Sequence, residues 1–204
     1  MFTWLRELVD PGDVKKASPE KAIVGLGNPG PRYAWTRHNA GFKLVESLAD
    51  NSRGWKKYRR LAGICTVEIA GRNVLLARPY TYMNLSGLAI KPLLRQLRLL
   101  PQDLLVVHDD LDLPAGRIRL RPGGGSGGHK GVQSVIDQLG SRDFARLRIG
   151  VGRPPQGMDA VDYVLKPFSW DERPFFEKAW SLAADAARCW AADGIEAAMN
   201  RYNG

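Results

Sequence analysis

An acid–base set of side chains follows a predicted strand near the middle of the chain. The apolar run at residues 104–107 is short and half β-branched, which is typical of a buried strand. His108, Asp109 and Asp110 come directly after it. Because ligands in open α/β sheets bind outside the carboxyl ends of strands, these side chains are candidates for a functional site.

A row of arginines and a glycine-rich stretch follow these carboxylates. Residues 117–121 alternate arginine with Ile118 and Leu120, which places three guanidinium groups on one face of a strand. Five of the six residues at 123–128 are glycine, and the stretch leads into His129 and Lys130. Although an isolated glycine-rich stretch is more often a mobile loop, glycines also let backbone N–H groups approach a ligand. The combination of acid, base, cations and glycines favours a site that handles a polyanion.

A second polar set follows the first predicted strand, at residues 22–26. The segment Gly25–Gly30 formally matches the dinucleotide fingerprint G-x-G-x-x-G, but Pro29 and Pro31 force an extended or turn conformation where a dinucleotide-binding helix would begin. The sequence therefore disfavours a dinucleotide-dependent oxidoreductase. We instead expect a surface loop over residues 28–37, and its polar side chains and those just beyond are site candidates: Asn28, Tyr33, Arg37, His38 and Asn39.

These residue types fit the attack of water on a carbonyl group. A histidine oriented by an aspartate acts as a general base, and carboxamides or an ammonium group stabilise the resulting oxyanion. Asn84 is equally consistent with a helix cap. No Gly-x-Ser-x-Gly elbow occurs, and no Gly-Lys-Ser/Thr follows the glycine stretch, which disfavours a serine nucleophile and a Walker-type nucleotide site. The run His108-Asp109-Asp110 lacks zinc-ligand spacing, so we expect no metal.

Composition indicates one globular domain with an anionic partner. The chain has 204 residues, 44% hydrophobic and 25% charged, with a net charge of +9. A nucleic acid is favoured over an anionic membrane because six arginines flank the glycine stretch: Arg117, Arg119, Arg121, Arg146, Arg148 and Arg153. The two cysteines, the absence of long apolar runs and the charged N-terminus indicate a cytoplasmic protein. We expect residues 1–20 to be an extension of unknown role and residues 21–204 to form the domain.

Hydrophobic periodicity predicts alternating strands and helices after the first strand. We expect a helix from about Thr36 or Asn39, a connecting loop or nucleic-acid contact at 53–60, a hairpin at 64–69 and 73–77, helices at 85–99 and 131–139, a strand at 146–151, an edge strand at 161–165, and helices at 171–192 and 194–202. The predicted fold is a single-domain α/β structure with a twisted, mixed and mostly parallel sheet surrounded by helices.

Several motifs in the same order resemble bacterial peptidyl-tRNA hydrolases. They are Gly25-Leu-Gly-Asn-Pro-Gly with Tyr33 and Thr36-Arg-His-Asn-Ala-Gly41, then Tyr82-Met-Asn-Leu-Ser-Gly87, His108-Asp-Asp-Leu-Asp-Leu-Pro114, Gly127-Gly-His129 and Arg148-Ile-Gly-Val-Gly152. The resemblance runs from about residue 22 to the C-terminus. It implies a monomeric α/β enzyme, without metal or cofactor, that cleaves the ester between a peptide or N-blocked aminoacyl group and the 3′ end of tRNA, recycling tRNA from aborted translation.

By position, His38 resembles the family's catalytic base and Asp109 the carboxylate that orients it. Asn28 and Asn84 resemble the carboxamides that hold the substrate, and Arg121 with Arg148 the pair that holds the tRNA 5′-phosphate. We expect further substrate contacts from Tyr33, Tyr82, Met83 and Lys130.

Lys130 is a departure from the resemblance, because the family commonly has asparagine there. Lysine has no carbonyl oxygen, so it cannot accept a hydrogen bond from the attacking water, but it can donate to substrate. The alternative is a non-catalytic RNA-binding relative on the same scaffold, similar to plant organelle splicing factors. Lys130 is the one feature that favours this alternative, whereas the joint presence of His38, Asp109, Asn28 and Asn84 favours the enzyme.

Overall fold

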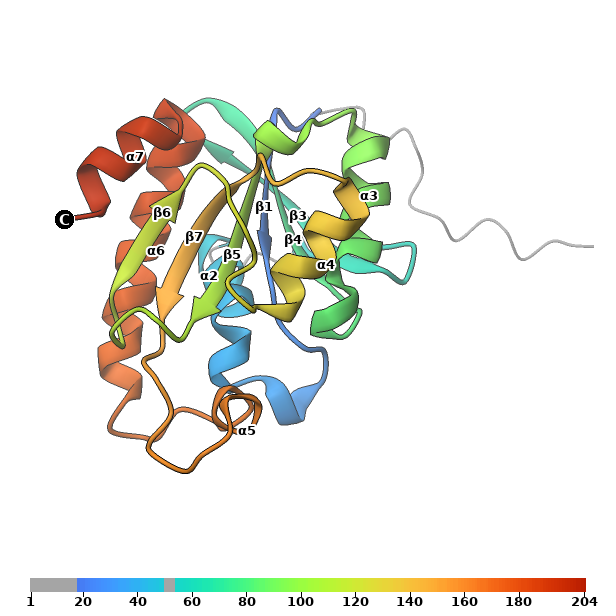
Figure 1. Cartoon of the computed structure of the whole chain (residues 1–204). Coiled ribbons are helices and arrows are strands. Elements are labelled where there is room, and N and C mark those ends of the chain that lie inside the picture. Colours follow the sequence, from blue (N-terminus) through green and yellow to red (C-terminus); the bar gives the residue numbers. More distant parts are fainter. Residues whose placement is uncertain (1–17, 50–53) are drawn as a thin grey trace, which may run out of the picture.

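The computed structural model describes residues 18–49 and 54–204, and its described strands form one seven-stranded sheet (Figure 1). The strand order is β2-β3-β4-β1-β5-β7-β6. The strands are β1 (Lys21–Gly25), β2 (Lys56–Tyr58), β3 (Ala62–Ile69), β4 (Arg72–Pro79), β5 (Leu104–Asp110), β6 (Ile118–Arg121) and β7 (Ala145–Gly150).

Parallel and antiparallel ladders occupy different parts of this sheet. The pairs β1–β4, β1–β5 and β5–β7 are parallel. The pairs β2–β3, β3–β4 and β6–β7, towards the two edges, are antiparallel. The predicted mixed sheet and the hairpin of β3 and β4 are confirmed. The sheet is not mostly parallel, however, because the strands at both edges pair antiparallel and only the central pairs are parallel. The central strands are apolar on both faces because helices cover both sides of the sheet.

Six described helices surround the sheet. They are α2 (Ala40–Leu48), α3 (Ser86–Leu97), α4 (Lys130–Leu139), α5 (Ala160–Val164), α6 (Arg173–Asp193) and α7 (Ile195–Tyr202). Short 3-10 turns lie at Pro31–Tyr33, Arg37–Asn39, Met83–Leu85 and Pro101–Asp103. Within the described residues, no helix combines the length and apolar character needed to cross a membrane.

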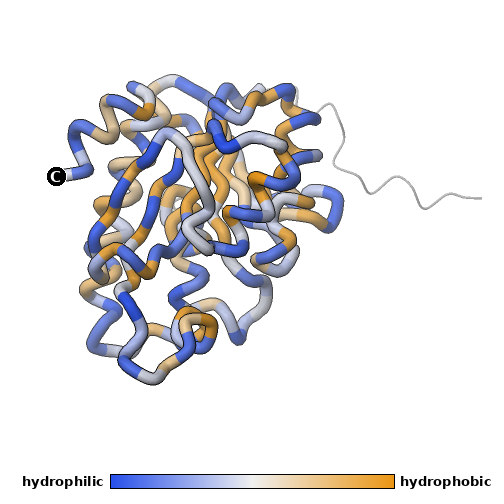
Figure 2. Tube along the Cα trace, in the orientation of Figure 1, coloured by the Kyte–Doolittle hydropathy of each residue, from blue (hydrophilic) through white to orange (hydrophobic). Residues whose placement is uncertain are grey.

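The sheet separates two apolar clusters, and β1 shows how the sequence divides between them. Ile23 belongs to the cluster that includes α2 and α6, whereas Ala22 and Val24 belong to the cluster that includes α3 and α4. This alternation follows from the two-residue period of a strand. Figure 2 shows the hydrophobic colour concentrated along the central strands. Cys65 and Cys189 are both buried in the first cluster.

The predicted edge strand at residues 161–165 is wrong, because this segment is helix α5. Its valines suggested a strand, but Asp159 caps a helix instead, accepting a hydrogen bond from the backbone N–H of Val161 at 2.7 Å. α5 forms part of the wall of the site described below.

The segment 53–60 also differs from the loop we expected. Lys56–Tyr58 forms the edge strand β2, and Tyr58 is buried with its hydroxyl donating to Gln96 Oε1 at 3.0 Å. Arg53 lies outside the described residues, as does most of the predicted extension at residues 1–20.

Candidate active site

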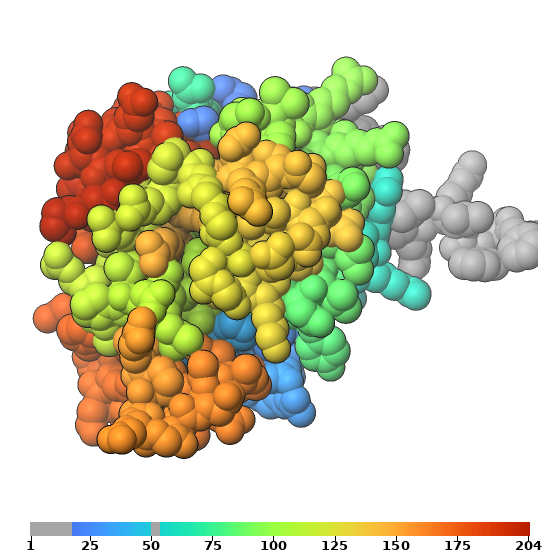
Figure 3. All heavy atoms as spheres, in the orientation of Figure 1, coloured from blue at the N-terminus to red at the C-terminus, as the bar shows by residue number. Residues whose placement is uncertain are grey.

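A cavity of about 520 Å³ opens at the carboxyl ends of β1 and β5, where the sequence placed the site. The cavity is lined by six separate segments, and its polar side chains include Asn28, His38, Asn84, Asp109, His129 and Lys130. Ser126 and the following glycines line one side, and Val161 and Val164 of α5 line another. In Figure 3 the yellow segment with the glycine-rich stretch lies above the orange segment with α5.

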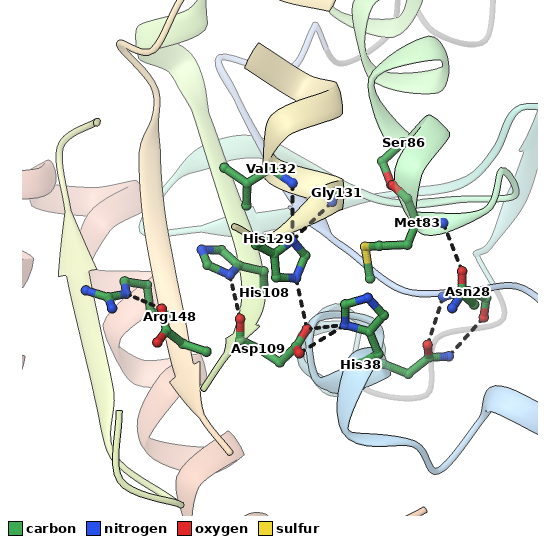
Figure 4. A network of polar contacts seen from close by, with 12 residues as sticks. Asn28, His38, Met83, Ser86, His108, Asp109, His129, Gly131, Val132 and Arg148 are labelled. Atoms are coloured by element: carbon green, nitrogen blue, oxygen red, sulfur yellow. Dashed lines mark hydrogen bonds and ion pairs between the residues drawn. The ribbon is translucent and has the colours of Figure 1, made fainter. Parts of the chain in front are cut away.

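His38 and Asp109 form a hydrogen-bonded pair in this cavity (Figure 4). Asp109 stands near the carboxyl end of β5 and is buried, and His38 is held in the 3-10 turn Arg37–Asn39. His38 Nδ1 lies 2.9 Å from Asp109 Oδ1 and 3.0 Å from Oδ2. Because an ionised carboxylate only accepts, Nδ1 carries the proton and donates it to Asp109. The other ring nitrogen, Nε2, is then available as a base.

The electrostatics of the pair keep Asp109 ionised. Burial alone would raise the pKa of Asp109, but the charge of His38 and the hydrogen bonds donated by His129 and His38 hold it well below the ordinary value. Burial alone would likewise lower the pKa of His38, yet the charge and hydrogen bond of Asp109 raise it above 6.5, with Lys130 opposing this rise. His38 is therefore suited to accept a proton near neutral pH.

His129 is a site residue that our sequence reasoning did not select. Its Nε2 lies 3.0 Å from Asp109 Oδ1, and its Nδ1 accepts hydrogen bonds from the backbone N–H groups of Gly131 and Val132, each at 3.2 Å. His129 is thus the N-cap of α4. Histidine is not among the preferred N-cap residues, so propensity could not reveal this role. The available signal was its position between the glycine stretch and a predicted helix.

His108 completes the cluster, so that all three histidines of the chain lie around Asp109. Its Nδ1 donates to the Asp109 carbonyl oxygen at 2.7 Å, and its ring packs edge-on against that of His129 at 4.7 Å. Burial lowers the pKa of His108 to about 3. His108 is therefore a neutral, packed residue and not an exposed base.

Asn28 is fixed by three hydrogen bonds so that one amide group remains available. Its backbone N–H donates to Asn39 Oδ1 at 2.8 Å, and Asn39 Nδ2 donates back to the Asn28 carbonyl at 3.0 Å. Asn28 Oδ1 accepts from the backbone N–H of Met83 at 2.8 Å. The remaining donor, the Nδ2 amide of Asn28, belongs to a residue that lines the cavity. Asn39 acts here as a structural support for Asn28.

The 3-10 turn Met83–Leu85 supplies the next part of the wall. Met83 is buried, whereas Tyr82 and Asn84 are exposed beside it, and all three line the cavity. Asn84 does not cap α3, which begins at Ser86 with Leu85 as its N-cap. The cap interpretation of Asn84 is therefore wrong, and its carboxamide is available to a ligand.

Two candidates from the first loop lie elsewhere. Tyr33 is not among the residues that line this cavity, and the guanidinium of Arg32 lies over its ring at 4.4 Å. Arg37 is buried and donates to the Pro167 carbonyl at 3.1 Å and to Glu172 at 2.6 Å. Arg37 therefore ties the loop that carries His38 to the segment between α5 and α6.

The atoms of His38, Asp109 and His129 also satisfy the spacing of a metal site, since their candidate ligand atoms lie within 4.8 Å of one another. Both facing ring nitrogens, however, are the donors of hydrogen bonds to Asp109 in this arrangement. A metal bound by Nε2 of His129 would require the proton on Nδ1, which accepts the two N–H groups of α4. The geometry fits a proton-holding network better than a metal centre.

The arginines of β6 and β7 share one face of the sheet, as the alternation predicted. Arg119 is paired with Arg148 and Arg121 with Arg146 in the ladder. Arg121 is exposed, and Arg148 Nε donates to Asp110 at 2.5 Å. Arg146 is buried and donates to the carbonyl oxygens of Gly124 and Gly125, so it holds the glycine-rich stretch in place. Burial, followed by repulsion from Arg148 and Arg142, lowers the pKa of Arg146 to about 10.

Comparison with known proteins gives one consistent result. The family model described as peptidyl-tRNA hydrolase matches residues 22–204. The peptidyl-tRNA hydrolase of Syntrophomonas wolfei is 50% identical over 184 residues, which cover 90% of this chain and 100% of that protein. That of Mycobacterium sp. (strain KMS) is 50% identical over 180 residues, 87% of this chain and 94% of that protein. The crystal structure of peptidyl-tRNA hydrolase from Acinetobacter baumannii matches with a TM-score of 0.84 at 37% identity, covering 92% of this chain and 96% of that one.

Proposed function

The chain belongs to the peptidyl-tRNA hydrolase family, and we propose that it hydrolyses the ester between a peptide, or an N-blocked aminoacyl group, and the 3′ end of tRNA. The observation that carries this proposal is the His38–Asp109 pair in the wall of the cavity, with His38 Nε2 left as a base. Release of a labelled N-acetyl amino acid from tRNA tests it.

The reaction needs one proton transfer in each direction. His38 Nε2 takes a proton from water while the water oxygen bonds to the ester carbonyl carbon. Asp109 stays ionised and stabilises the imidazolium that forms. The bond between the carbonyl carbon and the tRNA 3′ oxygen then breaks, and that oxygen takes the proton from His38. The products are tRNA with a 3′ hydroxyl and a carboxylic acid, which releases its proton to solvent and leaves as the carboxylate.

When water adds to the ester carbonyl, the carbonyl oxygen becomes an oxyanion, and hydrogen-bond donors around the cavity stabilise it. The free amide of Asn28, the carboxamide of Asn84 and the ammonium of Lys130 are N–H donors on side chains that line the cavity. Tyr82 and Met83 provide the wall against the substrate, and Tyr33 is assigned to a tRNA contact outside the cavity. We infer that the 3′ CCA end enters here while the basic face of β6 and β7 holds the 5′-phosphate region. A monomeric state and a cytoplasmic location are further predictions.

The pH profile should report the His38–Asp109 pair. Because Asp109 raises the pKa of His38 above 6.5, kcat/KM is expected to fall as the pH decreases through this raised pKa. The sign is opposite for folding, since a raised pKa stabilises the folded state below pH 6.5 and this contribution is lost as the pH rises through the raised value. A profile of kcat/KM, corrected for uncatalysed ester hydrolysis at each pH, measures the acidic limb. An acidic limb with its midpoint below pH 6.5 would contradict the effect of Asp109 on the pKa of His38.

The arginines of the basic face should matter for whole tRNA only. Arg121→Ala and Arg148→Ala are expected to raise KM for peptidyl-tRNA and to flatten its salt dependence, because each removes a phosphate contact. For a minimal substrate without the 5′-phosphate, the same two substitutions should raise KM much less. Exposed Arg188, which lies on α6 and pairs with Asp185, provides the matched control as Arg188→Ala. Equal losses on both substrates would contradict a phosphate-binding role.

Lys130 should act on the substrate and on His38 in opposite ways. Lys130→Asn removes a positive charge that opposes protonation of His38, so the acidic limb of the pH profile should move to higher pH. Asparagine keeps an N–H donor for the oxyanion and also supplies a carbonyl that accepts a hydrogen bond from water, so kcat above the limb is expected to stay equal or rise. Rates of Lys130→Asn and Lys130→Gln across a pH series measure both effects. A loss of about tenfold or more in kcat at high pH would assign Lys130 an essential role as a donor.

A further inference from the structure

We propose that His129 is a positioning residue that keeps the proton of His38 on Nδ1 and thereby leaves His38 Nε2 free to take a proton from water. This inference rests on the proposed function of the His38–Asp109 pair. His129 then has two roles: it is the N-cap residue of α4, and it sets which nitrogen of His38 carries the proton.

The cap fixes where the proton of His129 lies. A ring nitrogen that accepts a hydrogen bond carries no proton, and Nδ1 accepts from both Gly131 and Val132. The proton of the neutral ring must then be on Nε2, which faces Asp109 Oδ1 at 3.0 Å. His129 is thus a neutral donor to Asp109.

The carboxylate of Asp109 is consequently surrounded by donors. Oδ1 accepts from His129 Nε2 and from His38 Nδ1, and Oδ2 lies 3.0 Å from the same His38 atom. With Oδ1 held by His129, both oxygens remain turned towards His38. A carboxylate without this second donor would be free to rotate, and His38 would lose its fixed acceptor.

Packing keeps the His129 ring in this position. A Cβ atom at Gly131 would come within 2.3 Å of Met83 Sδ and 3.1 Å of His129 Cε1, so the first turn of α4 lies directly against the site. The ring of His108 packs at 4.7 Å on the β5 side. The titratable groups that face His38 and His129 are therefore Asp109 and His108 on β5 and Lys130 on α4. Neither His108 nor Lys130 takes the place of His129 as the donor to Asp109 Oδ1.

Two substitutions separate the contact with Asp109 from the cap. Asparagine is a preferred N-cap residue but is too short to reach Asp109, so His129→Asn keeps the cap and removes the donor. Glutamine places an amide N–H near the former Nε2 but is a poor cap, so His129→Gln keeps the donor and weakens the start of α4. Ser134→Ala is the matched control, because Ser134 lies on α4 and accepts from Gly87 N–H at 3.0 Å, away from Asp109.

The proposal predicts that the rate follows the donor and that stability follows the cap. In His129→Asn, kcat should fall about tenfold or more with KM nearly unchanged, as for other groups that orient a functional side chain. The His38 pKa should rise, since Asp109 then interacts with His38 alone. His129→Gln and Ser134→Ala should keep kcat within a few-fold while lowering the thermal unfolding midpoint. A larger loss of kcat in His129→Gln than in His129→Asn would overturn the proposal. Equal losses of kcat in the two variants, with the acidic limb of the pH profile unchanged, would also overturn it.

A measurement without substrate separates this inference from the proposed function. With three histidines in the chain, His38 can be assigned in a nitrogen-15 NMR titration by comparison with His38→Gln. We expect the wild type to show Nδ1 protonated in neutral His38, and His129→Asn to show a mixture of tautomers with a raised pKa. Unchanged tautomer and pKa would overturn the role of His129 even if ester hydrolysis were observed. The expected NMR result without any hydrolysis would instead count against the function alone.

Discussion

His38→Ala is expected to lower kcat for peptidyl-tRNA by about a thousandfold or more, because it removes the only ring nitrogen placed to take a proton from water. His38 Nδ1 is committed to Asp109, and His129 and His108 direct their protons to Asp109 as well. Neither of these histidines therefore offers a replacement base, since His108 is buried and is not among the described residues that line the cavity. Binding of tRNA should change little, since the basic face lies on β6 and β7.

Single-turnover hydrolysis and equilibrium binding of tRNA measure the two effects separately. His38→Gln is a needed companion, because Gln keeps an amide donor towards the buried carboxylate that His38→Ala would leave with one partner. If the Gln variant folds with an unchanged melting temperature and is equally slow, the loss is chemical. Full activity in either variant would remove His38 from the mechanism.

Asp109→Asn is expected to lower kcat by about a thousandfold to ten-thousandfold, although the side chain barely changes in size. Two ring N–H groups, from His38 and His129, point at this position. A carboxylate accepts both, whereas a carboxamide has one accepting oxygen and an NH₂ group that repels the second donor. Since the α4 cap fixes His129, we expect His38 to flip its proton to Nε2, which abolishes the base.

Asp110→Asn provides the matched control for this substitution. Asp110 is the next residue of β5 and its partner is Arg148, so its loss should alter tRNA affinity and leave kcat nearly unchanged. Because both Asp109→Asn and Asp110→Asn remove one negative charge from the lining of the cavity, comparing their kcat values separates the effect of charge from the effect on His38. Similar losses of kcat in both variants would show that charge, and not the proton position on His38, determines the rate.

The part of the site that strand ends determine could be predicted from sequence. The β-branched run before His108 identified β5, and Asp109 was expected at its carboxyl end because parallel strands end at a common edge. Pro29 and Pro31 correctly argued against a dinucleotide-binding helix after β1, since the chain forms a 3-10 turn there. Each of these two predictions needs only the residue types within one short segment of the chain.

Contacts between distant segments could not be predicted in this way. The link between His129 and Asp109 joins two elements that no periodicity relates, and His129 acts as a cap that residue preferences do not favour. The buried position of Arg146, which holds the glycine-rich stretch, depends on where that stretch crosses β7. The valines of residues 161–165 favour a strand, whereas the cap at Asp159 starts helix α5 there.

Hydrolysis of N-acetyl-aminoacyl-tRNA by the wild-type protein, measured beside His38→Gln and Lys130→Asn, tests whether His38 is the base that activates water for ester cleavage. We expect multiple turnovers in the wild type and a collapse of the rate in His38→Gln with tRNA binding preserved. In Lys130→Asn we expect a rate at least equal to that of the wild type above the acidic limb. Tight tRNA binding with no release of the N-acetyl amino acid would contradict this role of His38 and would point to the non-catalytic RNA-binding alternative.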